Sequence, residues 1–156
     1  HVNLTKPTIV KYADFTCDWD YDDFLCMVED TGCDGAIPCY RGFHPHTLWS
    51  NYYAYVREES MNAWDIQEKK PFTSSPRDEF ASSGTYYFKS GRLMKQYFDR
   101  GVKEDLTVAG EYYASMVYKP MMQDDLNIKV YELDPFMQWG TPIDLEEYSY
   151  WSKTFS

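Results

Sequence analysis

The stretch that decides the fold runs from Thr8 to Tyr40 and reads TIVKYADFTCDWDYDDFLCMVEDTGCDGAIPCY. Its opening, residues 8–13, is rich in β-branched side chains and predicts a strand that leads directly to Asp14. Its last residues, 34–40, predict a second strand. Because the segment between them has room for a helix, the stretch predicts one strand-helix-strand unit.

The segment between the two strands has the pattern of an amphipathic helix. Its apolar positions share one helical face: Tyr21, Phe24, Leu25 and Val28. Thr16 and Asp18 are both candidate N-caps, and Gly32 is expected to end the helix. A helix that joins two such strands favours a parallel strand pair with a right-handed crossover.

The rest of the chain continues to alternate between strand and helix patterns. We expect strands at residues 52–56, 63–67, 84–88 and 128–133, and helices that begin at Ser90, near Gly110 and after Thr141. The helix from Ser90 is expected to end at Gly101, and Pro120 disturbs the helix that follows it. This alternation predicts an α/β layered fold.

Length and charge narrow the classes of function. The 156 residues fit a single domain, 1–156, and 25 acidic against 15 basic residues give a net charge of -10, which argues against a nucleic-acid partner. No apolar run approaches the ~18 residues of a membrane span. The four cysteines form no Cys-x-x-Cys pair and no secretory signal opens the chain, so we expect free thiols in the cytoplasm.

Three places carry side chains suited to phosphate or metal chemistry. Asp14 follows a strand, where ligands bind in open α/β sheets, and could hold Mg²⁺ or equally cap a helix. Lys69 and Lys70 could contact a phosphate oxygen or form a solvated turn. His44 and His46 are a weaker candidate for a metal site, because no carboxylate lies near them in sequence.

Several short runs, taken in order, resemble motifs of the sugar-1-phosphate nucleotidylyltransferases, the family of the glucose-1-phosphate thymidylyltransferases and their relatives in capsule biosynthesis. They are Ile9–Asp14 (the strand before the metal-binding aspartate), Asp34–Ile37 (the next strand), Tyr53–Val56 (Tyr-Gly-Val-Val), Ile66–Pro71 (Glu-Glu-Lys-Pro), Ser83–Phe88 (Thr-Gly-Leu-Tyr-Phe), Gly110–Tyr113 (Gly-Glu-Leu-Glu) and Phe136–Pro142 (Trp-Leu-Asp-Thr-Gly-Thr-Pro). The sequence departs from the family pattern at Ala54, which replaces a glycine, and at Gln138, which replaces an aspartate.

The resemblance implies a set of binding residues and no catalytic side chain. Asp14 and Gln138 would hold Mg²⁺, and Lys69 or Lys70 would contact the phosphate of a sugar 1-phosphate. The sugar would contact the remaining members of the set, which are Tyr53, Ala54, Glu68, Gly84 and Glu111.

The resemblance also implies a fold and a reaction. The fold is a partial Rossmann-like, GT-A-like mixed sheet flanked by helices, and the reaction of complete members joins a sugar 1-phosphate to a nucleoside triphosphate. The family's glycine-rich triphosphate loop is not among these residues, so the similar part is the C-terminal, sugar-phosphate-binding portion. We expect a truncated or split member that is inactive alone, with a separate N-terminal half or a second copy of itself as partner. The alternative is a non-catalytic sugar-phosphate-binding or assembly module.

Overall fold

The computed structural model describes residues 2–44 and 53–155. The main helices are α1 (Tyr21–Thr31), α2 (Gly91–Lys103), α3 (Tyr118–Gln123) and α4 (Pro142–Phe155), and two 3₁₀ turns span Pro76–Asp78 and Ala114–Val117. The strands are β1 (Thr8–Lys11), β2 (Phe15–Cys17), β3 (Gly35–Tyr40), β4 (Ala54–Glu59), β5 (Asn62–Glu68), β6 (Phe80–Ser82), β7 (Thr85–Phe88), β8 (Thr107–Val108), β9 (Glu111–Tyr112), β10 (Ile128–Glu132) and β11 (Phe136–Gln138).

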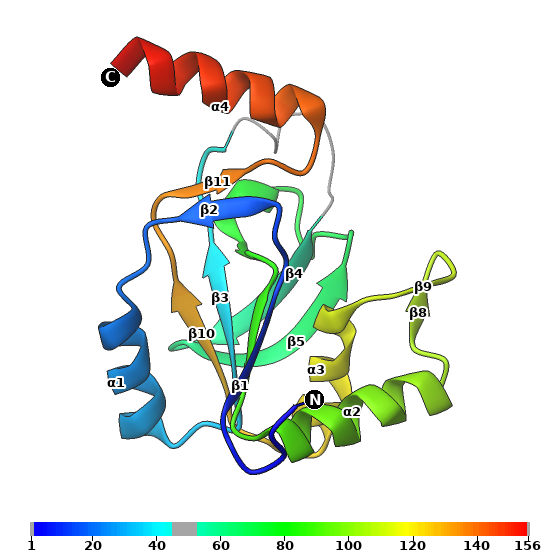
Figure 1. The fold of residues 1–156 in the computed structure, drawn as a ribbon. Helices are drawn as coiled ribbons and strands as arrows, with labels where there is room; N and C mark the ends of the chain where they lie inside the picture. Colours follow the sequence, from blue (N-terminus) through cyan, green and yellow to red (C-terminus); the bar gives the residue numbers. More distant parts are fainter. Residues whose placement is uncertain (1, 45–52, 156) are drawn as a thin grey trace.

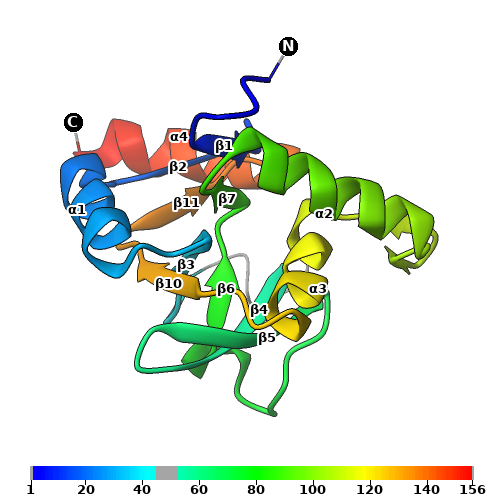
Figure 2. The same ribbon diagram turned by 90° about the horizontal axis from the view of Figure 1, so that it is seen from below.

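Seven of these strands form one mixed sheet in the order β1-β7-β3-β10-β5-β4-β6. The parallel pair is β3 with β10, and its register places Ile37 opposite Val130. An additional pairing of β3 with β6 closes β3, β10, β5, β4 and β6 into a ring, from which β7 and β1 extend (Figures 1 and 2). The prediction of a mixed α/β sheet flanked by helices is therefore confirmed.

The strand-helix-strand unit forms, but its two strands are not direct neighbours. β1 pairs antiparallel with β7, and β7 pairs antiparallel with β3, so β1 and β3 point the same way with β7 between them. The prediction of an adjacent parallel pair was wrong because β7 lies between β1 and β3. This strand, Thr85–Phe88, is buried along its whole length. The residues of β1 are only half-buried or exposed.

Helices cover both faces of the extended part of the sheet. Phe24 and Val28 of α1 pack on one face against Ala36 and Tyr87. On the other face, the larger cluster includes Tyr97 of α2 and residues of α3 together with Ile37, Phe88 and Val130. Ala36 and Ile37 point to opposite faces, as neighbours in a strand must. Figure 1 shows α1 on one side of the sheet and α2 and α3 on the other.

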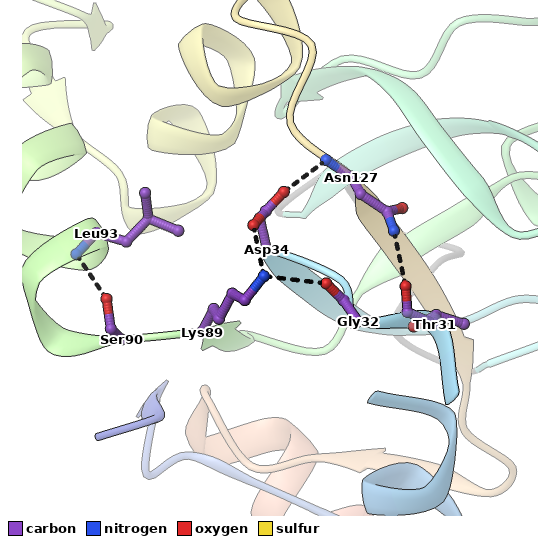
Figure 3. Close-up of polar contacts among 7 residues, drawn as sticks. All are labelled: Thr31, Gly32, Asp34, Lys89, Ser90, Leu93 and Asn127. Atoms are coloured by element: carbon purple, nitrogen blue, oxygen red, sulfur yellow. Dashed lines mark hydrogen bonds and ion pairs between the residues drawn. The ribbon is translucent and has the colours of Figure 1, made fainter. Parts of the chain in front are cut away.

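A polar clasp joins four elements at the end of the sheet where β3 begins (Figure 3). The carboxylate of Asp34 accepts the backbone N–H of Asn127 at 3.1 Å and lies 3.3 Å from the Lys89 ammonium. Lys89 also donates to the carbonyl of Gly32, and the Asn127 amide donates to the carbonyl of Thr31. The end of α1 and the ends of three strands are thereby held together, which fixes where β3 starts.

At the opposite end of the sheet, a small second layer covers the strands. β2 and β11 pair antiparallel, with Phe15 opposite Gln138. α4 follows β11 and lies above this pair in Figure 1. Thr141 and Asp144 exchange hydrogen bonds as an N-terminal cap, as the sequence predicts for this helix. No helix in the described part of the chain is long and apolar enough to cross a membrane.

Three local predictions are corrected. The N-cap of α1 is Asp20, whose side chain accepts from Asp23, because neither Thr16 nor Asp18 directly precedes the first turn. α2 continues past Gly101 to Lys103, because Gly101 packs against the core in helical conformation. The helix expected near Gly110 begins only at Tyr118, after the short hairpin β8–β9 and a 3₁₀ turn.

Candidate functional site

One cavity of about 450 Å³ gathers most of the residues that the sequence singles out. It lies between the end of β1, the β2–β11 layer and the strands β4, β5 and β6 of the ring. Six of the predicted residues line it, namely Asp14, Tyr53, Ala54, Glu68, Gly84 and Gln138. Lys69, Lys70 and Glu111 lie outside its wall.

Aromatic rings form much of the cavity wall. They are Tyr12, Phe15, Tyr53, Tyr86 and Phe136. Phe136 stacks flat on Tyr40 with ring centroids 4.0 Å apart, and Phe15 packs against Phe136 at 5.3 Å, so this part of the wall is braced by the core behind it. Burial raises the pKa of Tyr12, Tyr53 and Tyr86 above the ordinary value for tyrosine.

Glu68, the last residue of β5, brings a buried carboxylate to the cavity. Its side chain is 9% exposed, and one carboxylate oxygen accepts the hydroxyl of Ser115 at 2.5 Å. Burial raises the pKa of Glu68, while the Ser115 hydrogen bond and the nearby Lys69 charge oppose that shift. The charge of Glu68 also raises the pKa of Tyr12, and both residues line the cavity.

The chain between β6 and β7 forms a second part of the wall. Gly84 adopts a left-handed φ of +83°, and a Cβ there would come within 2.8 Å of the Tyr12 ring. The Ser82 hydroxyl donates to Tyr86 and accepts the N–H of Gly84. The Ser83 hydroxyl is buried and has no hydrogen-bond partner among the described residues. The left-handed backbone and the close Tyr12 ring therefore favour glycine at this turn of the wall.

Lys69 and Glu111 meet beside the cavity through a shared tyrosine. The Lys69 ammonium donates to the Tyr113 hydroxyl, which donates to the Glu111 carboxylate, and the two charges are 3.6 Å apart. The Tyr113 hydrogen bond is the main cause that raises the pKa of Lys69 and lowers that of Glu111. The backbone N–H of Lys69 also donates to the carbonyl of Tyr53, a wall residue. Lys70 is exposed and makes no hydrogen bond or ion pair with the described residues.

Asp14 and Gln138 border one small space above Gly140. A Cβ on Gly140 would lie 3.2 Å from the Asp14 carboxylate and 3.5 Å from the Gln138 amide nitrogen. That nitrogen donates to Asp144 at 2.7 Å, so the amide oxygen is the branch directed away from Asp144. Within residues 2–44 and 53–155, no group of three or more carboxylate, histidine or cysteine side chains gathers to form a closed metal cage.

Sequence reasoning missed several wall residues. Ser82 and Ser83 directly precede Gly84, and Gly140 and Thr141 lie inside a run that the resemblance includes, so their positions were within reach. Tyr113, although it ends the run Gly110–Tyr113, and Ser115 were not singled out, because their partners Lys69 and Glu68 are distant in sequence. Of the two histidines, His44 packs edge-on against Tyr40 at 4.6 Å and is not a wall residue, and His46 lies outside the described residues.

Comparison with known proteins identifies the fold. No family model matches the chain, and no curated protein gives a significant match. Among solved structures, a nucleoside-diphosphate-sugar pyrophosphorylase from Vibrio cholerae RC9 matches with a TM-score of 0.68 and 17% identity over 91% of this chain and 55% of that one. An apo UDP-glucose pyrophosphorylase gives a TM-score of 0.70 at 14% identity, over 96% and 56%.

A third structure, described as a glucose-1-phosphate thymidylyltransferase from Bacillus anthracis in complex with a sucrose, gives a TM-score of 0.63 at 14% identity over 92% of this chain and 53% of that one. Likeness at such low identity establishes a nucleotidyltransferase-like fold. The chain spans about half the length of the structures it matches.

Proposed function

We propose that the cavity binds a sugar phosphate and that the chain supplies the sugar-phosphate half of a site for nucleotide-sugar synthesis. The observation that carries the proposal is the convergence of six residues, predicted from five separate runs of sequence, on one cavity of about 450 Å³. That volume suits a monosaccharide. The fold, shared with sugar pyrophosphorylases, supports the same assignment.

Within this proposal the wall and its neighbour Lys69 have different tasks. Tyrosine rings offer stacking surfaces, and the Glu68 carboxylate offers an acceptor for sugar hydroxyls. Lys69 is a cation beside the cavity and would pair with the phosphate. It would either leave Glu111 or divide its donors between Glu111 and the phosphate. We give Lys70 no role in binding, because it is exposed and makes no hydrogen bond or ion pair with the described residues.

The residues around Gly140 offer one oxygen ligand for Mg²⁺. The Asp14 carboxylate would hold the ion, whereas Gln138 directs its amide nitrogen toward Gly140 and donates it to Asp144. Mg²⁺ commonly takes one or two protein oxygens and completes its shell with water and phosphate oxygens. When bound, it would neutralise charge on the phosphates. With a single protein carboxylate as ligand, the affinity of the free protein for Mg²⁺ is expected to be weak.

The triphosphate-binding part of such a site lies outside these residues in our proposal. Among the described residues, β1 pairs only with β7, and its other edge is open beside Tyr12 and Asp14. A further segment or a second chain that adds a strand at this edge would stand next to the cavity. We assign the nucleotide-binding part to that position.

Two measurements on the 156-residue chain test the proposal. Calorimetry with glucose 1-phosphate is expected to show binding, and Gly140→Leu is expected to weaken it because the added side chain enters the space between Asp14 and Gln138. A pyrophosphate-release assay with common triphosphates is expected to show no turnover by these residues alone. Absence of sugar-phosphate binding by the wild type would refute the proposed function, and turnover would refute the placement of the nucleotide-binding part elsewhere.

A further inference from the structure

The cavity wall carries negative charge and no positive charge. Asp14 and Glu68 line it, whereas no lysine, arginine or histidine of the described chain does so. A phosphate inside this wall would face two carboxylates. The anionic end of a ligand therefore belongs beside Lys69, and the cavity itself receives the other end.

Glu68 lacks an ionic partner at the cavity. Ser115 holds one of its oxygens, and the other makes no hydrogen bond or ion pair with any residue the structure describes. The neighbouring Lys69 ammonium does not serve, because it is directed to Tyr113 and Glu111. A buried carboxylate with a single neutral hydrogen bond is costly, and a cationic group entering the cavity would offset that cost.

The aromatic rings of the wall also suit an ammonium group. They line the cavity, and aromatic faces attract cations. The Glu68 carboxylate and these rings thus border a space whose described lining contains no cationic side chain.

We propose that the cavity selects a ligand that carries an ammonium group. This inference rests on the proposed function and narrows it: the substrate class is an amino-sugar phosphate with a free amine, whose phosphate pairs with Lys69 while the ammonium lies against Glu68 and the rings. A neutral sugar phosphate leaves Glu68 unpaired, and an acylated amine lacks the charge.

The test is calorimetry with three sugar phosphates that differ at one substituent. At a pH at which the amine is protonated, we compare glucosamine 1-phosphate, N-acetylglucosamine 1-phosphate and glucose 1-phosphate. The wild type is expected to bind glucosamine 1-phosphate about tenfold more tightly than the other two ligands. This is the gain in affinity expected from one charge-assisted contact of the ammonium group with Glu68 together with its contacts to aromatic rings. Glu68→Gln is expected to abolish the preference for glucosamine 1-phosphate over glucose 1-phosphate. Glu29→Gln, on the exposed face of α1, is the control and keeps the preference.

Each outcome decides between the two proposals. Equal affinity for all three ligands, or a preference for either neutral one, overturns the inference and leaves the proposed function standing. A preference for glucosamine 1-phosphate that survives in Glu68→Gln also overturns the inference, because a group other than Glu68 would then recognise the ammonium charge. Failure of all three ligands to bind overturns the proposed function and the inference with it.

Discussion

The Lys69 ammonium lies 3.6 Å from the Glu111 carboxylate, and the Tyr113 hydroxyl bridges them. The two residues come from the end of β5 and the start of β9, so this contact fixes the β8–β9 hairpin beside the cavity. The contact also distinguishes Lys69 from Lys70 as the candidate phosphate ligand, because Lys69 takes part in it and Lys70 does not. The sequence alone does not make this distinction.

Lys69→Ala is therefore expected to weaken binding of glucose 1-phosphate by about fivefold to twentyfold, because it removes the cation next to the cavity. Lys70→Ala is the matched control, with the same change of charge one residue along the chain, and is expected to stay within about twofold. Calorimetry at constant ionic strength measures both. Equal losses would show that the phosphate responds to general charge rather than to the Lys69 position.

Gly84→Ala is expected to destabilise the protein more than Gly110→Ala. Both glycines have left-handed φ values, +83° and +81°, so each alanine costs about 1–2 kcal/mol of backbone strain. At Gly84 the new Cβ also meets the Tyr12 ring at 2.8 Å, whereas nothing lies within 4 Å at Gly110. Urea unfolding compares the two variants, and glucose 1-phosphate affinity is expected to fall only for Gly84→Ala. Equal free energies of unfolding would contradict the close packing of Tyr12 on the turn.

Glu68→Gln is expected to raise the free energy of unfolding at pH 7. Burial raises the pKa of Glu68, so the folded state binds the proton more tightly than the unfolded chain, where the pKa is about 4.3. The ionised form thus lowers stability at every pH above the raised pKa, and the cost vanishes as pH falls below the unfolded value. Urea unfolding between pH 4 and 8 should show the gain of Glu68→Gln at neutral pH and its loss near pH 4. A gain independent of pH, or one also shown by Glu29→Gln, would remove ionisation as its cause.

Asp34→Ala is expected to lower the free energy of unfolding by about 1–3 kcal/mol, because the partly buried N–H of Asn127 loses its acceptor. Lys89→Ala, which removes the other side of the clasp at an exposed position, is expected to cost less than about 1 kcal/mol. Neither change should alter ligand binding, since the clasp lies at the opposite end of the sheet. If Lys89→Ala costs as much as Asp34→Ala, the ion pair rather than the backbone hydrogen bond stabilises the clasp.

The open edge of β1 is expected to pair with a second copy in the absence of another partner, giving a mass near twice 18.5 kDa in light scattering at micromolar concentration. Hydrogen exchange of β1 amides should slow as the concentration rises, whereas exchange in α2 should not change. A monomer mass at all concentrations would rule out this pairing. A charge at Ile9 is a poor probe, because Ile9 packs against the Phe24 and Val28 cluster and its loss would disturb the core.

Local sequence pattern predicts the amphipathic helix and the strands that are buried along their whole length. α1 and the buried strands at Gly35–Tyr40 and Thr85–Phe88 were expected from local pattern, and each packs as that pattern requires. Local pattern carries no information on which strands pair, so the insertion of β7 beside β1 was missed. The three-residue strands Phe15–Cys17 and Phe136–Gln138 are too short for a pattern, and they form only because each has the other as partner.

The candidate site was predictable where its residues follow one another and unpredictable where the fold brings them together. Glu68, Gly84 and Gln138 lie in short runs with recognisable composition, and the cavity contains all three. The choice between Lys69 and Lys70 depends on Tyr113, and the constraint on Glu68 depends on Ser115. These partners come from the segment after β8, where a helix had been expected.

The turn at Gly84 has a consequence for how the specificity of this cavity could change. Upstream of the glycine, β6 belongs to the closed ring, and downstream β7 belongs to the open extension with β1. The cavity lies at this corner, where Tyr12, Ser82, Ser83 and Gly84 all contribute to its wall. Its width therefore depends on the angle at which the extension leaves the ring. We expect homologous chains to accommodate larger or smaller ligands by changing that angle, while each wall side chain is kept.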